Sequence, residues 1–301
     1  GNYSGGRFCI NSVTGPDEYT CLVNNNYYTN VLAQYNLKWA ARFYRILREA
    51  DLLSPVEQKL GLTEEEIDSF ERAAKAMYLP YDAALDINPQ DDAFLSKKVW
   101  NLDDTPPEDF PLLLHYHPLC LYRSQVCKQA DTVLAHFILE DAQALSTMKH
   151  SFEYYEKVTT HDSSLSTCIF SIMASRLGMP EKAYAYFGES SKLDLFNTHK
   201  NTKDGIHTAN MGGTYMAMVY GFGGLRIKED GLHLAPTLPG QWEEYDFKVH
   251  DGDSLIQISV QRRGCEITLL DGTEKEIFVY GKSHMLRDSL RLPLEEWGRN
   301  Q

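Results

Sequence analysis

The sequence lacks the patterns of several well-known classes of chemistry. It has no glycine-rich phosphate-binding loop, no GxSxG nucleophile motif and no dinucleotide-binding fingerprint. No run approaches the roughly 20 apolar residues of a membrane-spanning helix, and no signal peptide opens the chain. We therefore expect neither a membrane protein nor a nucleotide-dependent enzyme of a common type.

Paired cysteines and excess positive charge are also missing. The six cysteines form no CxxC pair, and most lie in apolar surroundings. They predict reduced core residues in a cytoplasmic protein, with neither metal sites nor disulfides. The 29 basic residues are outnumbered by 42 acidic ones, which gives a net charge of -13. This charge argues against binding to nucleic acid or to an anionic membrane, so any anion site has to be built locally.

The 301 residues, 43% of them hydrophobic, can bury the core of one large domain or two ordinary ones. Apolar residues recur at helical spacing from Tyr27 to Ala50. Thr63 with Glu66 forms a capping-box pattern at the start of another helix. The expected helices cover about residues 27–50, 63–78, 124–139, 142–157, 164–177, 180–190 and 208–221, while 80–109 has the composition of a loop.

After Gly221 the pattern changes to the alternation typical of strands. Four turn sequences predict hairpins: Glu229-Asp230-Gly231, Asp251-Gly252-Asp253, Arg263-Gly264 and Asp271-Gly272. We predict a mainly α chain, with a helical domain over 1–222 and a small antiparallel β domain over 223–301. The tail from about Lys282 is weakly patterned. The serial helices fit a helical toroid, but composition alone fits an ordinary helical bundle equally well.

A polar loop near the start of the chain contains the first candidate for catalysis. In TGPDEYTCLVNNNYYT, Gly15 and Pro16 make a turn that presents Asp17 and Glu18 beside tyrosines and asparagines. Neutral hydrogen-bonding groups around one acid suit the binding of a sugar and the protonation of a glycosidic oxygen. A general acid also needs partial burial and few cationic neighbours. We expect Glu18 to be this acid and Asp17 to fix the loop; a simple turn before a helix cap is the alternative.

Other candidates follow along the chain. Lys128 and Gln129 could bind sugar hydroxyls from a helix, or form a solvated surface pair. His207 and Thr208 begin a helix within the most cationic window, which suits an oxyanion such as phosphate; a basic loop with a core-facing histidine is the equally weighted alternative. Ser164 and Ser166 are either helix caps or phosphate ligands. No carboxylate or cysteine near His115 and His117 completes a metal site, so we expect them in a polar loop facing substrate.

Five motifs in a fixed order support a more specific interpretation. GPDEY, NNNYYTN, LYRSQVCKQAD, HDSSLS and GIHTANMGGTY together resemble the maltose, trehalose and kojibiose phosphorylases, the inverting α-glucoside phosphorylases among the glycoside hydrolases. The resemblance covers nearly the whole chain. It implies an (α/α)6 toroid followed by a small antiparallel β domain, with Glu18 as the general acid. It also implies that Lys128 and Gln129 hold the glucosyl unit, that His207 and Thr208 bind phosphate with Ser164 and Ser166 as weaker candidates, and that the loop 115–122 faces the acceptor sugar.

The resemblance also implies that part of the enzyme is absent. Members of the family are longer, and a β-sandwich, a linker and the first toroid helices precede their GPDEY loop. The chain thus resembles a C-terminal half, whose partner would be the missing N-terminal half and whose full-length form would be a cytoplasmic homodimer. Half a toroid would leave apolar helix faces exposed.

The expected reaction is inverting phosphorolysis of an α-glucosyl disaccharide to β-glucose 1-phosphate, with inorganic phosphate as co-substrate and no cofactor. An inverting hydrolase is the enzymatic alternative, and it would need a second carboxylate where HTANMGGT has none. A fragment that is inactive without its other half is the alternative from another class.

Overall fold

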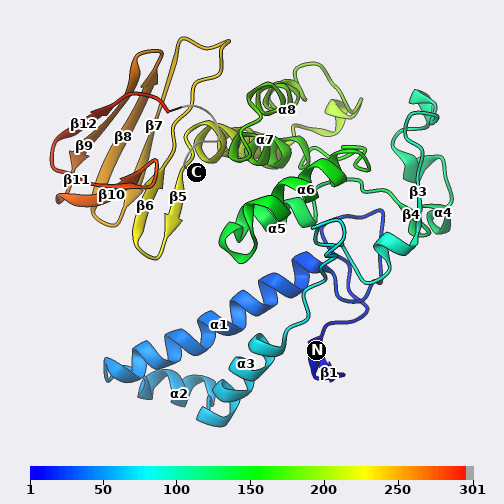
Figure 1. Cartoon of the computed structure of the whole chain (residues 1–301), viewed down its shortest axis with the longest axis horizontal. Helices are drawn as coiled ribbons and strands as arrows, with labels where there is room; N and C mark the ends of the chain where they lie inside the picture. Colours follow the sequence, from blue (N-terminus) through cyan, green and yellow to red (C-terminus); the bar gives the residue numbers. More distant parts are fainter. Residues whose placement is uncertain (296–301) are drawn as a thin grey trace. The chain divides into compact units, whose positions relative to one another are not determined.

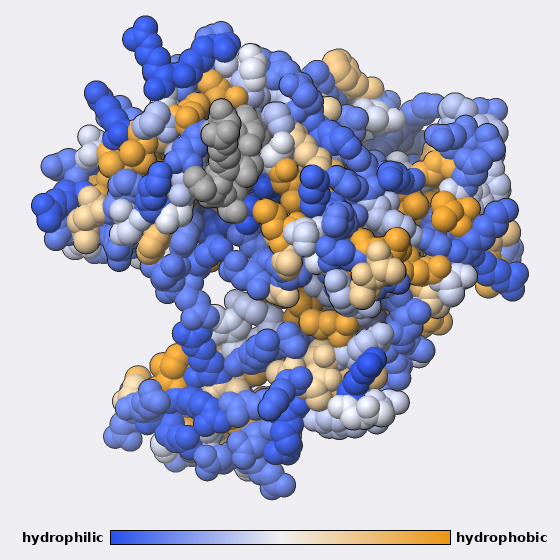
Figure 2. All heavy atoms as spheres, in the orientation of Figure 1, coloured by the Kyte–Doolittle hydropathy of each residue, from blue (hydrophilic) through white to orange (hydrophobic). Residues whose placement is uncertain are grey.

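The computed structural model describes residues 1–295, and the chain forms two compact units that divide between Asp162 and Ser163. Figure 1 labels their helices and strands. The face drawn in Figure 2 is mostly polar, with separate apolar spots, as the excess of charged residues leads one to expect. Within the described part of the chain, every helix is too short or too polar to span a membrane.

The first unit is mainly helical. Its elements are β1 (Asn2–Ser4), β2 (Arg7–Cys9), α1 (Tyr27–Glu49), α2 (Ser54–Leu60), α3 (Glu64–Ala76), β3 (Lys98–Val99), α4 (Pro118–Tyr122), β4 (Ser124–Gln125), α5 (Thr132–Ile138) and α6 (Leu145–Glu156). The short strands pair as β1 with β2 and as β3 with β4. The first 222 residues were predicted to contain helices alone, and these two small sheets show that this prediction is wrong.

The long helix α1 begins where the sequence predicts, because the Asn26 side chain accepts a hydrogen bond from the Thr29 N–H and caps it. Its N-terminal half buries Tyr27 and Val31 against Ala135. Its C-terminal half packs against α3, where Ala41 and Tyr44 meet Leu53 and Ile67. Another face of the same helix stays exposed; it includes Tyr35, Phe43 and Ile46.

Lys128 and Gln129 do not lie on a helix, contrary to the predicted helix over 124–139. Helix α5 begins only at Thr132. The preceding backbone bonds to other segments instead: the Cys127 N–H donates to the Val158 carbonyl at 2.8 Å, and the Lys128 N–H donates to the Asp17 carboxylate at 2.7 Å. These partners replace the local helical bonds, so tertiary contacts override the helical pattern of the sequence.

The second unit combines α7 (Thr167–Arg176), α8 (Pro180–Lys192) and α9 (Thr208–Met216) with the strands. Helix α7 is its central helix, with every residue from Thr167 to Ser175 buried. Helix α9 continues into a π-helical segment, Ala217–Phe222, and the first strand begins at Arg226. Because the two compact units divide elsewhere, the domain limits 1–222 and 223–301 stay a prediction.

The strands of residues 226–292 form two four-stranded sheets. They are β5 (Arg226–Lys228), β6 (Gly231–Leu234), β7 (Glu244–Asp251), β8 (Ser254–Gln261), β9 (Gly264–Asp271), β10 (Lys275–Val279), β11 (Lys282–Leu286) and β12 (Ser289–Leu292). One sheet has the order β11-β10-β6-β5 and the other β12-β9-β8-β7. In β8, alternate residues are buried, which explains the period of two in the sequence.

Three of the four predicted hairpins are confirmed, because β5–β6, β7–β8 and β8–β9 pair antiparallel. The fourth is wrong: after Asp271-Gly272 the chain crosses to the other sheet, where β10 pairs parallel to β6. The β domain is thus antiparallel in all but this pairing. The residues from Lys282 onward were also misjudged, since β11 and β12 close the edges of the two sheets. Residues 296–301 of the tail lie outside the described residues.

Candidate functional site

The adjacent acids Asp17 and Glu18 have opposite environments. Asp17 is fully buried, whereas 58% of the Glu18 side chain is exposed. The Asp17 carboxylate accepts hydrogen bonds from the N–H groups of Tyr19 (3.1 Å) and Lys128 (2.7 Å) and from the Gln90 side chain (3.0 Å). Asp17 therefore fixes the loop, as predicted, and leaves Glu18 as the acid that a substrate can reach.

The structure brings Glu18 and Lys128 together in an ion pair between Oε2 and Nζ. Next to it, the Gln129 side chain donates to the Pro16 carbonyl. These contacts place Glu18, Lys128 and Gln129 in one small region, although 110 residues separate the first two in the sequence. The predicted surroundings of the acid were wrong in one respect, because Glu18 is more exposed than expected and has a cationic neighbour.

Two of the three asparagines in the run use their side chains within the fold. Asn25 and Asn26 are buried. Asn25 accepts from the Ile10 N–H at 3.1 Å and donates to Asp92 at 2.8 Å. Asn26 caps α1 and donates to the Asp131 carboxylate at 3.1 Å. The prediction of a sugar-gripping asparagine cluster thus fails for these two, because their amide groups are used within the fold.

Asp131 is a second buried carboxylate beneath the loop, and the sequence pattern did not single it out. Its Oδ2 accepts the Asp17 N–H at 3.2 Å. Burial raises the pKa of Asp17 to about 6. Burial, followed by the charge of Asp17, raises the pKa of Asp131 to about 8. Two carboxylates that are buried close together repel each other when both are ionised, so such a pair commonly keeps one proton near neutral pH.

Tyr19 anchors the other side of the loop. Its hydroxyl donates to the Asp162 carboxylate and accepts the Leu112 N–H at 2.9 Å. Its ring packs with Leu112, Leu121 and Val126 in a buried cluster. The two histidines that were predicted to face the acceptor sugar follow Leu112 in the chain. His115 lies 3.8 Å from the Asp109 carboxylate, and His117 caps α4 by accepting the Leu119 N–H. Both histidines are exposed, in a segment joined to the acid loop through Leu112.

In the second unit, His207 precedes the first residue of α9 and is held by a carboxylate that the sequence analysis missed. Its Nδ1 lies 2.5 Å from Asp194 Oδ1, and its N–H donates to Oδ2 at 2.9 Å. The hydrogen bond from His207 lowers the pKa of Asp194. Thr208 is exposed at the start of the helix. The carboxylate on Nδ1 orients the ring, and the Asn201 side-chain nitrogen lies 3.3 Å from its Nε2.

The two candidate serines differ in accessibility. Ser164 is partly exposed ahead of α7, whereas Ser166 is fully buried at the residue before the helix. Gly213 serves the packing of the helices. A Cβ at this position would lie 2.6 Å from the Cys168 sulfur, so the missing side chain lets α9 pack against α7.

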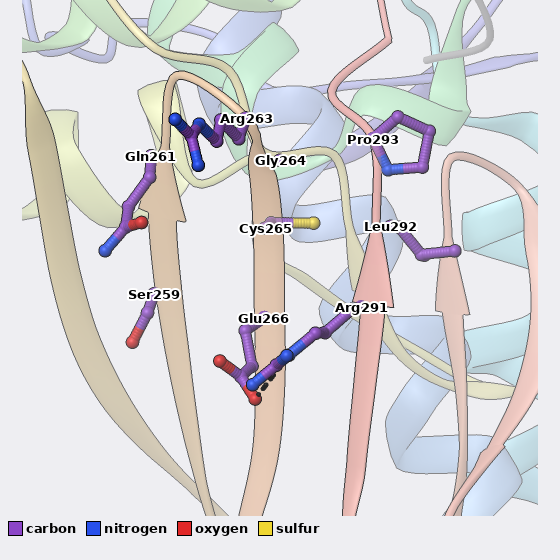
Figure 3. A pocket seen from close by; sticks show the side chains of 9 residues that line it. All are labelled: Ser259, Gln261, Arg263, Gly264, Cys265, Glu266, Arg291, Leu292 and Pro293. Carbon is purple, nitrogen blue, oxygen red and sulfur yellow. Dashed lines mark hydrogen bonds and ion pairs between the residues drawn. The ribbon is translucent and has the colours of Figure 1, made fainter.

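A separate groove of about 610 Å³ lies on the strands β8, β9 and β12 (Figure 3). Figure 3 shows Ser259 and Gln261 along one strand and the ion pair between Arg291 and Glu266 across the next two, 3.0 Å long. None of the predicted site residues lines it. Across residues 1–295, no group of three or more potential ligands is arranged to hold a metal ion.

Comparison with known proteins decides which family these features represent. The description "Glycosyl hydrolase family 65 central catalytic domain" matches residues 2–216, and that of the family's C-terminal domain matches residues 225–286. The chain belongs to glycosyl hydrolase family 65. The predicted family resemblance is confirmed, and so is the expectation of toroid helices followed by a β domain.

Several of its relatives in this family are described as disaccharide phosphorylases. The α,α-trehalose phosphorylase of Geobacillus stearothermophilus is 60% identical over 95% of this chain. The maltose phosphorylase of Bacillus subtilis is 32% identical over 93% of it. A solved structure of a candidate kojibiose phosphorylase from human microbiome has a TM-score of 0.88 and 31% identity over 97% of the chain. The chain spans only 38%, 36% and 40% of these three proteins, so it matches a part of each.

Proposed function

We propose that this chain supplies the proton donor and the phosphate-binding part of an inverting disaccharide phosphorylase. In the proposed reaction, phosphate oxygen attacks the anomeric carbon of an α-glucoside and the glycosidic C–O bond breaks. The Glu18 proton moves to the leaving oxygen. The products are β-glucose 1-phosphate and the freed sugar, and no cofactor takes part. The observation that carries this proposal is the loop geometry: Asp17 is buried and Glu18 is presented beside Lys128.

Lys128 and Gln129 have a defined role in this proposal. The Lys128 ammonium pairs with Glu18. A general acid must carry a proton when it meets the glycosidic oxygen. We infer that bound sugar hydroxyls take over the Lys128 ammonium, while Gln129 keeps its hold on the Pro16 carbonyl and so on the loop. His115 and His117 would then face the acceptor sugar.

The surroundings of His207 support phosphate as the attacking group. A hydrolase needs a free carboxylate to activate water on the face opposite the acid. The structure does add a carboxylate, Asp194, but both of its oxygens are bound to His207. It therefore supports the histidine as an anion ligand, with Thr208 beside it and Ser164 as a further candidate. Ser166 would need a rearrangement to take part, since it is fully buried.

We propose trehalose as the first disaccharide to test, because the match to a trehalose phosphorylase is 60% identical and those to maltose and kojibiose phosphorylases are 32% and 34% identical. The six free cysteines suit a reducing, cytoplasmic setting. A homodimer that includes the remaining part of the enzyme is the proposed assembly.

The test uses a chimera in which this chain replaces the matching stretch of the G. stearothermophilus enzyme. We expect glucose release from trehalose to depend on phosphate and to yield an equal amount of β-glucose 1-phosphate. The chain alone and the chain mixed with the remaining part of the enzyme are assayed in parallel. Release at a comparable rate without phosphate would show a hydrolase, and absence of turnover in all three preparations would contradict an enzymatic role.

A further inference from the structure

Two buried aspartates, one in the loop of Glu18 and one packed against that loop, take no part in the proposed reaction. They nevertheless make hydrogen bonds that shape the surroundings of Glu18. Asp17 is 0% and Asp131 3% exposed, so neither can reach a sugar or phosphate. They come from segments 114 residues apart in the sequence. Buried carboxylates are costly unless hydrogen bonds satisfy them, so the partners of these two show what the fold gains from keeping them.

The two carboxylates hold the backbone on both sides of Glu18. The Asp17 N–H, just before Glu18, donates to Asp131 Oδ2 at 3.2 Å. The Tyr19 N–H, just after Glu18, donates to Asp17 Oδ1 at 3.1 Å. The peptide group that follows Glu18 and the peptide group between Pro16 and Asp17 are therefore both held by side-chain carboxyl oxygens.

The same carboxylate oxygen also holds the segment that carries the cation. Asp17 Oδ1 accepts the Lys128 N–H at 2.7 Å, and Asp17 Oδ2 accepts from the Gln90 side chain at 3.0 Å. Asp131 in turn accepts from Asn26, the cap of α1. Asp17 Oδ1 thus binds the backbone N–H groups of both Tyr19 and Lys128. This holds the two segments side by side, so that the Glu18 and Lys128 side chains can form their ion pair.

Resting on the proposed function, we propose that Asp17 and Asp131 are positioning residues that hold the backbone segments of Glu18 and Lys128 in register for proton transfer. They touch no substrate and act only through the two charged residues. The arrangement needs acceptors: Asp17 receives three hydrogen bonds and Asp131 receives bonds from two groups. An ionised carboxylate accepts stronger hydrogen bonds than an amide oxygen does, so Asp17 holds the Tyr19 and Lys128 N–H groups more firmly than an asparagine would.

Because Asp17 acts as an acceptor, exchanging the donor and acceptor roles of Asp17 and Gln90 tests whether this hydrogen bond positions the loop. Asp17→Asn places an N–H₂ group against the Gln90 N–H₂ group, so one contact becomes donor against donor. Gln90→Glu in the same chain restores an acceptor for the new amide, and it leaves an oxygen for the Cys127 thiol, which now donates to Gln90 at 3.2 Å. The double variant therefore regains the Asp17–Gln90 contact with reversed polarity.

The first experiment measures amide hydrogen exchange by NMR in the chain itself, which needs no activity. We expect Asp17→Asn to speed exchange at the Tyr19 and Lys128 amides about 10-fold, because a neutral oxygen replaces the charged acceptor and the donor facing Gln90 pushes the side chain away. The swap should reverse much of this change. Asp86→Asn is the matched control, because Asp86 also binds several donors but lies outside this network, on Tyr81 and Thr147.

Unchanged exchange at both amides in Asp17→Asn would overturn the proposal. So would equal acceleration by Asp86→Asn, because that result would show general loosening of the fold. If Asp17→Asn does not fold, Asp131→Ala provides the same test, because it removes the acceptor of the Asp17 N–H, which should then exchange about 10-fold faster or more.

The second experiment measures kinetics in the trehalose phosphorylase chimera. A positioning role predicts that Asp17→Asn lowers kcat about 10-fold or more with little change in KM for the disaccharide, and that Gln90→Glu partly restores kcat. Equal loss in the single and double variants would count against positioning. If the chimera shows no phosphorolysis at all, the proposed function fails, while the exchange experiment still decides whether the two aspartates hold the loop.

Discussion

The loop around Glu18 and the segment around His207 carry the two halves of the proposed chemistry, yet they are held in different ways. Beneath Glu18 lie the buried polar groups of Asp17, Asp131 and Asn26, bonded to one another and to Gln90. His207 relies on Asp194 and a weaker contact to Asn201 at 3.3 Å, in a segment with highly exposed apolar side chains, namely Leu195, Phe196 and Ile206.

This difference indicates which functional groups the fold holds most firmly in place. Proton donation requires a donor placed to within hydrogen-bonding distance of one atom, and buried side chains bonded to one another provide such placement. Phosphate presents several equivalent oxygens, so a helix start with one oriented histidine can bind it without a rigid frame. We expect substitutions near Glu18 to have larger effects than equivalent substitutions near His207.

The largest effect is expected from removing the acid itself. Glu18→Gln should lower turnover by the chimera about 10²- to 10⁴-fold, because general acid catalysis is typically worth that much. Disaccharide binding should change little. The control is Glu65→Gln, an exposed glutamate on α3. A variant that retains more than about a tenth of the parent rate would remove Glu18 from its assigned role.

A glycine-to-alanine pair tests how tightly each region is packed. A Cβ on Gly15 would lie 2.4 Å from both the Asn26 and the Asp131 side chains, whereas one on Gly212, near His207, would meet nothing within 4 Å. Gly15→Ala should therefore lower the free energy of unfolding by about 1–3 kcal/mol. Gly212→Ala should raise it by about 0.5–1 kcal/mol through helix propensity. Urea unfolding measures both, and similar values would contradict the contrast between the regions.

The buried carboxylates also predict how stability depends on pH. The pKa of Asp131 is raised from 3.8 to about 8, so the folded chain keeps a proton that the unfolded chain loses above about pH 4. The contribution of Asp131 to the free energy of unfolding is therefore complete below pH 4. It falls as the pH rises to 8, by at most about 1.4 kcal/mol per pH unit.

Asp131→Asn should accordingly flatten the fall in unfolding free energy between pH 6 and pH 8, measured by urea unfolding at each pH. This range avoids most of the opposing effect of His161, whose pKa burial lowers from 6.5 to about 4. An unchanged slope in the variant would show that Asp131 is already ionised in the folded chain at pH 6.

The smallest effect is expected at the phosphate side. Asp194→Asn removes the charged partner of His207 and should raise KM for phosphate in the chimera about tenfold, with kcat less affected. Asp204→Asn, an exposed aspartate of the same segment, is the matched control. If KM for phosphate stays the same, His207 does not depend on Asp194 for anion binding. A kcat loss as large as that of Glu18→Gln would instead indicate a catalytic base.

Much of the fold followed from local patterns. The period of apolar residues placed α1, the Thr63 cap placed the start of α3, and alternation placed β7 to β9. The pattern failed over 124–131, where backbone groups bond to distant partners such as Asp17. It also failed at Asp271-Gly272, because a turn signal does not reveal whether the next strand joins the same sheet.

By itself, the sequence determined the family, the succession of helices and strands, and the identity of Glu18 as the candidate acid, since these depend on motifs and on spacing along the chain. Only the tertiary structure decided that Asp17 is buried while Glu18 is exposed, that Lys128 pairs with Glu18, and that Asp194 holds His207. The physical reason is that a polar residue reveals its hydrogen-bonding capacity in the sequence, but packing of distant segments selects its partner.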